Sequence, residues 1–231
     1  MKEDLPLWIS ILFAGTVVGA IAWFKASTTS RKFLFIAVTW ALLQSVLAIK
    51  GVFLDTFSLP PRIMALGVAP PLLLIILLFN TTKGKAFIDA LHLKTLTWFH
   101  SIRIAVEIVL VLLFHQGLIS VYMTFEGANF DILSGITAPA IAYFAFRNAE
   151  PNRNLLLAWN IFCLLLLLII IFISALAVPS PFQKISPDQP NIAILYFPFN
   201  LLPSVVVPLV FFAHLVAIRR LTQNQKRGPL S

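Results

Sequence analysis

Residues 154–177 read NLLLAWNIFCLLLLLIIIFISALA, and no Asp, Glu, Lys or Arg interrupts them. The central run from Leu164 to Ile171 contains only leucine and isoleucine. About 20 such residues in a helix cross the hydrocarbon core of a bilayer, where each backbone polar group must be bonded within the chain. The stretch therefore predicts a transmembrane helix.

Six further apolar segments have the length and composition of a span. We therefore expect an all-α integral membrane protein, a bundle of about seven transmembrane helices in one polytopic domain over residues 1–220. The segment 131–147 is the shortest and most polar of them. The predicted helices are 6–24, 33–53, 62–80, 99–121, 131–147, 154–177 and 192–217, with an amphipathic interfacial helix at 84–94 and a disordered cytoplasmic tail at 221–231.

The composition of the whole chain agrees with this reading. Apolar residues make up 59% of the 231 residues and charged residues 11%, against about 45–50% and about 25% in soluble domains. The net charge of +8 is typical of basic cytoplasmic loops, and no basic stripe with interleaved aromatics indicates nucleic-acid binding. The single cysteine, Cys163, has no partner for a disulfide within the chain.

The loop charges predict the orientation. Most of the 17 lysines and arginines fall in alternate loops, whereas most acids fall on the opposite side. Because basic loops stay in the cytoplasm, we expect the N-terminus outside, the C-terminus inside, and the chain in a cell membrane, most simply a prokaryotic inner membrane. The basic side holds Lys25, Arg31, Lys32, Lys83, Lys85, Lys94, Arg147, Arg153, Arg219, Arg220, Lys226 and Arg227.

The fourth predicted helix carries ionisable residues at membrane depth. His100, Arg103 and Glu107 follow one another at helical spacing and share a face. Such residues are costly in lipid, so they are functional candidates. Glu107 could carry a proton, act as counter-ion to a cationic ligand or ligate a metal; alternatively it forms a structural ion pair with Arg103, four residues earlier.

The seventh predicted helix carries His214, with Asn200 and Ser204 on the same side. His100 and His214 are expected at similar depth, which suggests either a shared metal or haem site or two interfacial histidines bonded to carbonyls or headgroups. No close histidine pair or Cys-x-x-Cys motif supports a metal, and the sequence requires no cofactor. Asn160 lies in the inner half of the sixth helix, as a further polar candidate or as a link between helices.

Proline interrupts two of the predicted helices. Pro198, Pro203 and Pro208 lie in the seventh, and Pro70 and Pro71 in the third. Each proline removes a donor and frees the carbonyl four residues back. These carbonyls could meet a ligand, or the kinks could only shape the packing.

A second group of polar residues is expected at the outer surface. Lys50 and His115 lie near outer helix ends, where Lys50 could instead extend to the interface. With acids from the outer loops they could form a vestibule. Its candidates are Lys50, His115, Glu126, Asp131 and Asp188.

These features favour a small transporter or permease with an intramembrane polar site on the fourth and seventh helices. The alternatives are a membrane enzyme or redox protein using His100, Glu107 and His214, and a sensor or scaffold subunit of a membrane complex. The expected partners are the lipid bilayer and a small solute or ion. A retinal protein is excluded because the last helix has no lysine for a Schiff base.

Overall fold

A computed structural model describes residues 5–223, which contain helices and loops but no strand. Six helical stretches are long and apolar enough to cross a membrane, so the composition and the fold agree on a multi-pass helical membrane protein. The α-helices are α1 Leu7–Lys25, α2 Arg31–Ile49, α3 Ala69–Asn80, α4 Thr82–Asp89, α5 Leu93–Phe99, α6 Ile102–His115, α7 Ile132–Ala145, α8 Arg153–Ala177 and α9 Val207–Gln223. The 3-10 helices are η1 Val52–Leu54, η3 Val121–Met123 and η4 Ala193–Leu195, and the π-helices that precede α3 and α9 are η2 Ile63–Val68 and η5 Leu202–Val206.

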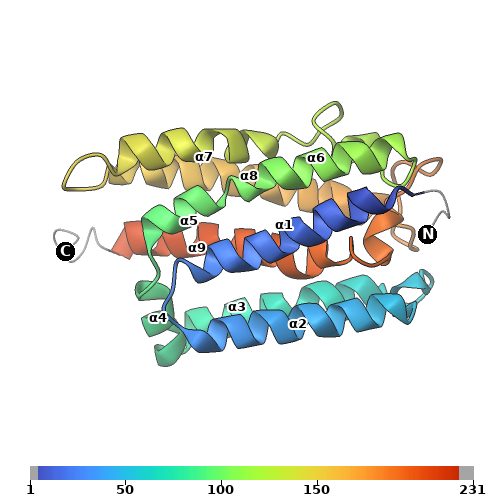
Figure 1. Ribbon diagram of the computed structural model, residues 1–231, viewed down its shortest axis with the longest axis horizontal. Coiled ribbons are helices and arrows are strands. Elements are labelled where there is room, and N and C mark those ends of the chain that lie inside the picture. The colour runs from blue at the N-terminus through green and yellow to red at the C-terminus, as the bar shows by residue number, and fades with distance from the viewer. Residues whose placement is uncertain (1–4, 224–231) are drawn as a thin grey trace.

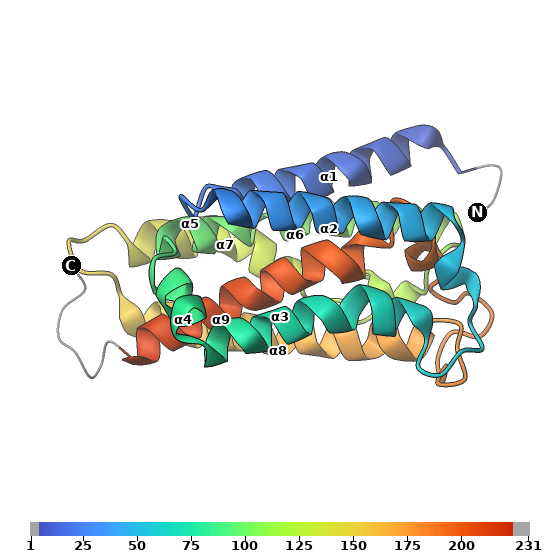
Figure 2. The same ribbon diagram turned by 90° about the horizontal axis from the view of Figure 1, so that it is seen from below.

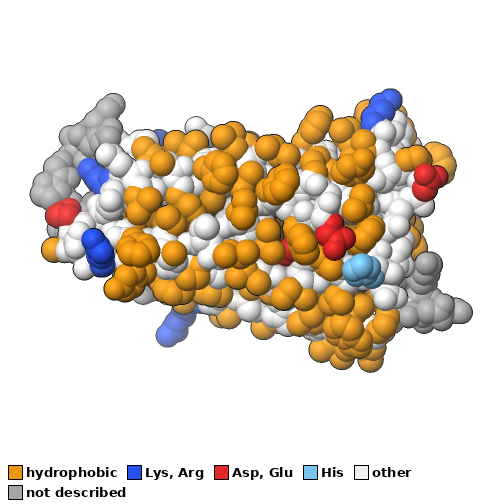
Figure 3. All heavy atoms as spheres, turned by 90° about the horizontal axis from the view of Figure 1, so that it is seen from above, with side chains coloured by type: hydrophobic (Ala, Val, Ile, Leu, Met, Phe, Trp, Pro, Cys, Tyr) orange, Lys and Arg blue, Asp and Glu red, His pale blue; other side chains and the backbone are white. Residues whose placement is uncertain are grey.

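The long helices run along one axis of the molecule, with α9 in the middle of the bundle in both views (Figures 1 and 2). The stretch from η5 through α9 is largely buried, whereas α2 and α3 are mostly exposed. The first residue of α1 and the last of α9 lie at opposite ends of the molecule (Figure 1). Apolar side chains cover the middle of the face seen in Figure 3, and Lys and Arg lie toward its ends. This is the surface that lipid requires.

Two predicted helices have different boundaries in the structure. The fourth span is Leu93–His115, formed by α5 and α6 with a break at His100 and Ser101, so it starts and ends about six residues earlier than expected. The last span begins at Leu202 instead of residue 192, because residues 196–200 form a bend and turns before the helix. It continues to Gln223, and the remainder of the predicted tail lies outside the described residues.

Two other predicted segments are shorter than expected. The segment predicted as an interfacial helix contains the helix α4, Thr82–Asp89, while residues 93 and 94 already belong to α5. At 14 residues, α7 is shorter than the about 20 that a full crossing needs.

Side chains of α2 donate hydrogen bonds to two backbone carbonyls that have no helical donor because the residue four positions later is a proline. Trp40 Nε1 donates to the Ser204 carbonyl at 2.8 Å, which has lost its helical donor to Pro208. Gln44 Nε2 donates to the Leu66 carbonyl at 2.9 Å, which has lost its donor to Pro70. These bonds attach α2 to α3 and α9, so both kinks serve packing at these points.

We expect Trp40→Phe to destabilise the protein by about 1–3 kcal/mol, because the Ser204 carbonyl would be left without a donor in an apolar setting. The free energy of unfolding in detergent measures this. Trp8→Phe is the matched control, since Trp8 is 54% exposed and its change should stay within about 0.5 kcal/mol. Equal effects of the two substitutions would contradict the assignment.

Candidate functional site

The segment between α6 and α7 folds back along α6. Gly117, with φ of 72°, provides the left-handed turn after α6 that L-residues avoid. Figure 1 shows that α7 then begins beside the middle of the bundle. We call residues 118–131 the returning loop. The sequence predicted part of it as helix and the remainder as an exposed outer loop.

The loop between α8 and η4 anchors the returning loop. Gln189 Nε2 donates to the Phe114 and Ile119 carbonyls at 2.9 and 2.7 Å. Asn191 Oδ1 accepts the Ser120 N–H at 2.9 Å. The returning loop is therefore fixed at its start by partners about 70 residues away in the chain.

Four polar side chains form a continuous network inside the bundle. Arg103 Nη1 lies 3.1 Å from Asp131 Oδ1, and both side chains are largely buried. Asn129 Oδ1 accepts the Asp131 N–H at 3.1 Å. Asn129 Nδ2 donates to Glu107 Oε2 at 2.6 Å, and the Phe125 N–H donates to Glu107 Oε1 at 2.7 Å.

Arg103 forms its ion pair with an acid of the returning loop. Its carboxylate partner among the described residues is Asp131 and not Glu107. Glu107 accepts from two neutral N–H groups of the returning loop, the Phe125 amide and Asn129 Nδ2. Among residues 5–223, Glu107 thus has no cationic partner of its own.

The network lines a cavity of about 500 Å³ between α3, α6, α8 and α9, which is within the size range of small-molecule sites. We call it the central cavity. Its remaining walls are mostly apolar and include Met64, Leu72, Val106, Leu110, Met123, Leu167, Ile171, Pro203, Val207 and Phe211. A ligand that fits it has a large apolar body and a polar or charged group beside Glu107.

The histidines come together, as expected from their depth. The rings of His100 and His214 stack with centroids 3.9 Å apart and an interplanar angle of 20°. His214 Nδ1 bonds to Asn160 Oδ1 at 2.9 Å, and Trp159 packs edge-on against His100 at 5.4 Å. All four side chains are buried.

The stacked geometry does not converge on a metal. Nitrogens of parallel rings point outward instead of toward a common ion. In residues 5–223 no group of three or more His, Cys, Asp and Glu is placed to hold one. The histidine pair with Glu107 that the enzyme hypothesis requires is not assembled, and the histidines instead link α5, α8 and α9.

The remaining candidates lie elsewhere. Asn200 Nδ2 donates to the Gln44 carbonyl of α2 at 3.0 Å, whereas Ser204 Oγ donates to the Asn200 carbonyl of its own segment at 2.8 Å. Asp131 belongs to the buried network and not to the predicted vestibule. The other vestibule candidates are exposed: Lys50, His115, Glu126 and Asp188.

Sequence reasoning missed Asn129, which joins Glu107 to Asp131. Residues Glu126, Gly127, Ala128 and Asn129 are small or polar. They precede a helix that is too short to cross a bilayer, and this combination could have indicated a loop that folds back into the bundle.

Gly127 sets the path of the returning loop. A Cβ there would lie 2.4 Å from the Val121 carbonyl oxygen and 2.7 Å from Tyr122 Cα, so the backbone would have to shift. We expect Gly127→Ala to raise the hydrogen-exchange rate of the Phe125 amide at least tenfold, because its bond to Glu107 would loosen. Gly15→Ala is the control, since a Cβ at Gly15 meets nothing within 4 Å; an unchanged Phe125 amide in Gly127→Ala would refute this account of the loop.

Comparison with known proteins gives a family and no activity. No curated protein and no solved structure matches the chain. One family model matches residues 60–222, which include α3 to α9, the returning loop and every residue of the polar network. The chain belongs to the family described as Domain of unknown function (DUF8737).

Proposed function

We propose that the protein is a small membrane carrier that binds a lipophilic cation in the central cavity and exchanges it for a proton on Glu107. One observation carries this proposal: Glu107 lies in the wall of a mostly apolar cavity of about 500 Å³, and no described residue is its cationic partner. The charged side chains that line the cavity are Arg103, Glu107 and Asp131.

The charges of Arg103, Glu107 and Asp131 determine the sign of the charge that the ligand should carry. With both acids ionised, one positive and two negative charges leave the site at −1. An excess charge at membrane depth is costly, so it favours either a proton on Glu107 or a bound cation. The two occupants compete for one carboxylate, which is the requirement for exchange.

The walls determine what kind of cation fits. A small inorganic ion needs a shell of oxygen ligands, whereas the walls of the central cavity are mostly carbon. A cation with aromatic or aliphatic substituents places its charge beside Glu107 and buries its apolar body, which is favourable in proportion to the area removed from water.

The returning loop supplies a gate for this exchange. Phe125 and Asn129 hold the Glu107 carboxylate from the loop side. A proton on Glu107 converts an acceptor into a donor, and a cation competes with both N–H groups. Either occupant therefore weakens the attachment of the loop, which links occupancy of the site to opening on that side.

We propose further that α7 and the returning loop together complete a seventh crossing. The opposite positions of the ends of α1 and α9 (Figure 1) support an odd number of crossings, and the loop charges support an outer N-terminus in a cell membrane. The returning loop then closes the central cavity toward the outside.

Proteoliposomes test the carrier directly, with ethidium as the probe. An acidic lumen should drive ethidium inward as protons leave, at a saturable rate well above that of protein-free vesicles. The uptake should collapse when a protonophore removes the pH gradient. Saturable binding of the cation without any flux would overturn the carrier and favour a sensor; absence of both would overturn the site.

A further inference from the structure

We infer that a groove between α2, α3 and α9 binds an acyl chain of an anionic phospholipid, whose headgroup lies between Lys32 and Lys83. The inference is independent of the proposed transport, because this groove and the central cavity share only Pro208 among their described lining residues. We call it the lipid groove. It encloses about 460 Å³, and its apolar lining includes Phe33, Ile36, Ala37, Trp40, Leu74, Ile75, Leu78, Phe87, Leu209 and Phe212.

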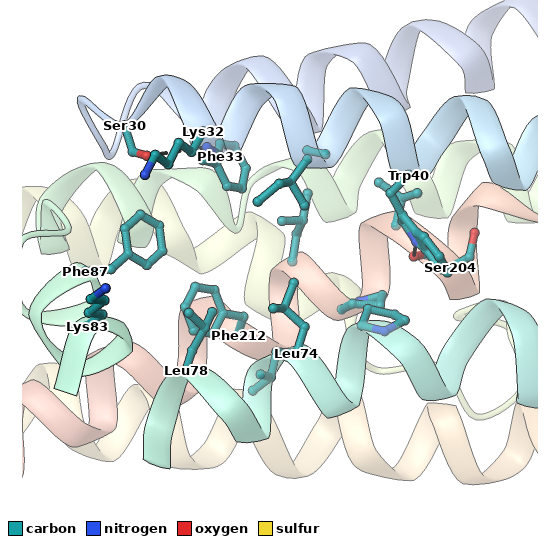
Figure 4. Close-up of a pocket in the computed structure, with 17 residues that line it drawn as sticks. Ser30, Lys32, Phe33, Trp40, Leu74, Leu78, Lys83, Phe87, Ser204 and Phe212 are labelled. Carbon is teal, nitrogen blue, oxygen red and sulfur yellow. Dashed lines mark hydrogen bonds between the residues drawn. The ribbon is translucent and has the colours of Figure 1, made fainter. Parts of the chain in front are cut away.

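The charges are confined to one end of the groove. Figure 4 shows Lys32, Lys83 and Ser30 together at one end, and Trp40 and Ser204 at the other. No acid is among the described residues of the lining. Within residues 5–223, neither lysine has a hydrogen bond or an ion pair.

The local backbone adds to this positive end. Lys32 lies in the first turn of α2 and Lys83 in the first turn of α4. Ser30 Oγ and Thr81 Oγ1 already accept the first-turn N–H groups of Phe33 and Gly84. The positive end of each helix dipole nevertheless favours an anion nearby. Two lysines and two helix starts thus complement a phosphate group.

The dimensions of the groove match one leaflet. From Lys32 to Trp40 the helix rises about 12 Å at 1.5 Å per residue, close to half of the about 30 Å hydrocarbon core. Ile36 on one wall and Leu74 on the other remain 51% and 41% exposed, so the groove is open along its side to lipid. A chain attached to a headgroup can enter from the bilayer, whereas a free phosphate would leave the apolar floor uncovered.

Native mass spectrometry of the full-length delipidated protein tests this inference. Phosphatidylglycerol and phosphatidylcholine with identical chains are offered in equal amounts. We expect phosphatidylglycerol to be retained preferentially. The double variant Lys32→Gln/Lys83→Gln should lower its affinity by roughly 30-fold, with little change for phosphatidylcholine.

Two further variants make the test specific. Lys85→Gln/Lys94→Gln removes the same charge from exposed residues outside the groove and should lower the affinity only a few-fold. Ala37→Phe, which fills the apolar floor, should reduce retention of both lipids. Equal losses in the two lysine variants, full retention in Ala37→Phe, or displacement of the lipid by inorganic phosphate would each overturn the inference.

Discussion

Replacing Glu107 with glutamine will lower the affinity for tetraphenylphosphonium by at least about thirtyfold. The substitution keeps the size of the side chain and one of its two loop bonds, but it removes a carboxylate of the central cavity that has no cationic partner within the described part of the chain. Losing one member of a buried charge pair costs about 2–5 kcal/mol, of which 1.4 kcal/mol is a factor of ten. Equilibrium dialysis of the detergent-solubilised protein measures the affinity.

Two controls accompany this variant: a Glu→Gln change in the returning loop and an anionic probe of the same shape. Glu126→Gln makes the same chemical change at an exposed position and should leave the affinity unchanged. Tetraphenylborate, an anion of nearly the same shape, should bind poorly. The affinity of the wild type should also weaken as the pH falls, because the proton and the cation compete for Glu107. Equal affinity in Glu107→Gln and wild type would remove Glu107 from the site.

Removing Arg103 will destabilise the protein by about 3–5 kcal/mol, the usual effect of breaking a buried ion pair. Arg103→Met leaves Asp131 and Glu107 in the same cavity wall with no positive charge beside them. Asp131→Asn should cost less, since Glu107 lies one helical turn from Arg103 and can take over as its partner. The free energy of unfolding in detergent measures both, and the double variant should recover most of the loss.

The exposed pair of Arg62 and Asp55 is the control for this cycle. Its atoms approach to 2.5 Å, but its side chains are 45% and 36% exposed, so Arg62→Met should cost no more than about 1 kcal/mol. Similar losses at Arg62 and Arg103 would show that the buried network does not stabilise the fold as described.

The helices could be predicted because hydrophobic length is a local property. Residues 154–177 are apolar throughout, and α8 covers Arg153–Ala177. Depth along a helix is also local, which is why His100 and His214 were expected at one level and are found stacked. Their role could not be predicted, because ring orientation depends on how α5 and α9 rotate against each other.

The returning loop could not be predicted by the same rules. The apolar residues Leu118, Ile119 and Val121 follow His115 in the sequence. Even so, α6 ends at His115, because Gly117 turns the chain and Gln189 and Asn191 hold it. The partner of Arg103 was missed for the same reason. Glu107 is the neighbour of Arg103 along the helix, whereas Asp131 comes next to Arg103 only because the returning loop folds back along α6.

The central cavity and the lipid groove share one wall. Pro208 on α9 lines both, and the Ser204 carbonyl that it frees is held by Trp40. A lipid in the groove would therefore pack against the same part of α9 that encloses the proposed cation site.

Photolabelling tests the central claim most directly, because it reports where a lipophilic cation binds. The probe is a quaternary ammonium ion bearing a benzophenone, and the labelled peptides are mapped by mass spectrometry. We predict adducts on the lining of the central cavity, such as Met64 and Met123, which tetraphenylphosphonium suppresses and tetraphenylborate does not. Adducts confined to the lipid groove, or labelling that tetraphenylphosphonium does not reduce, would contradict the proposed site.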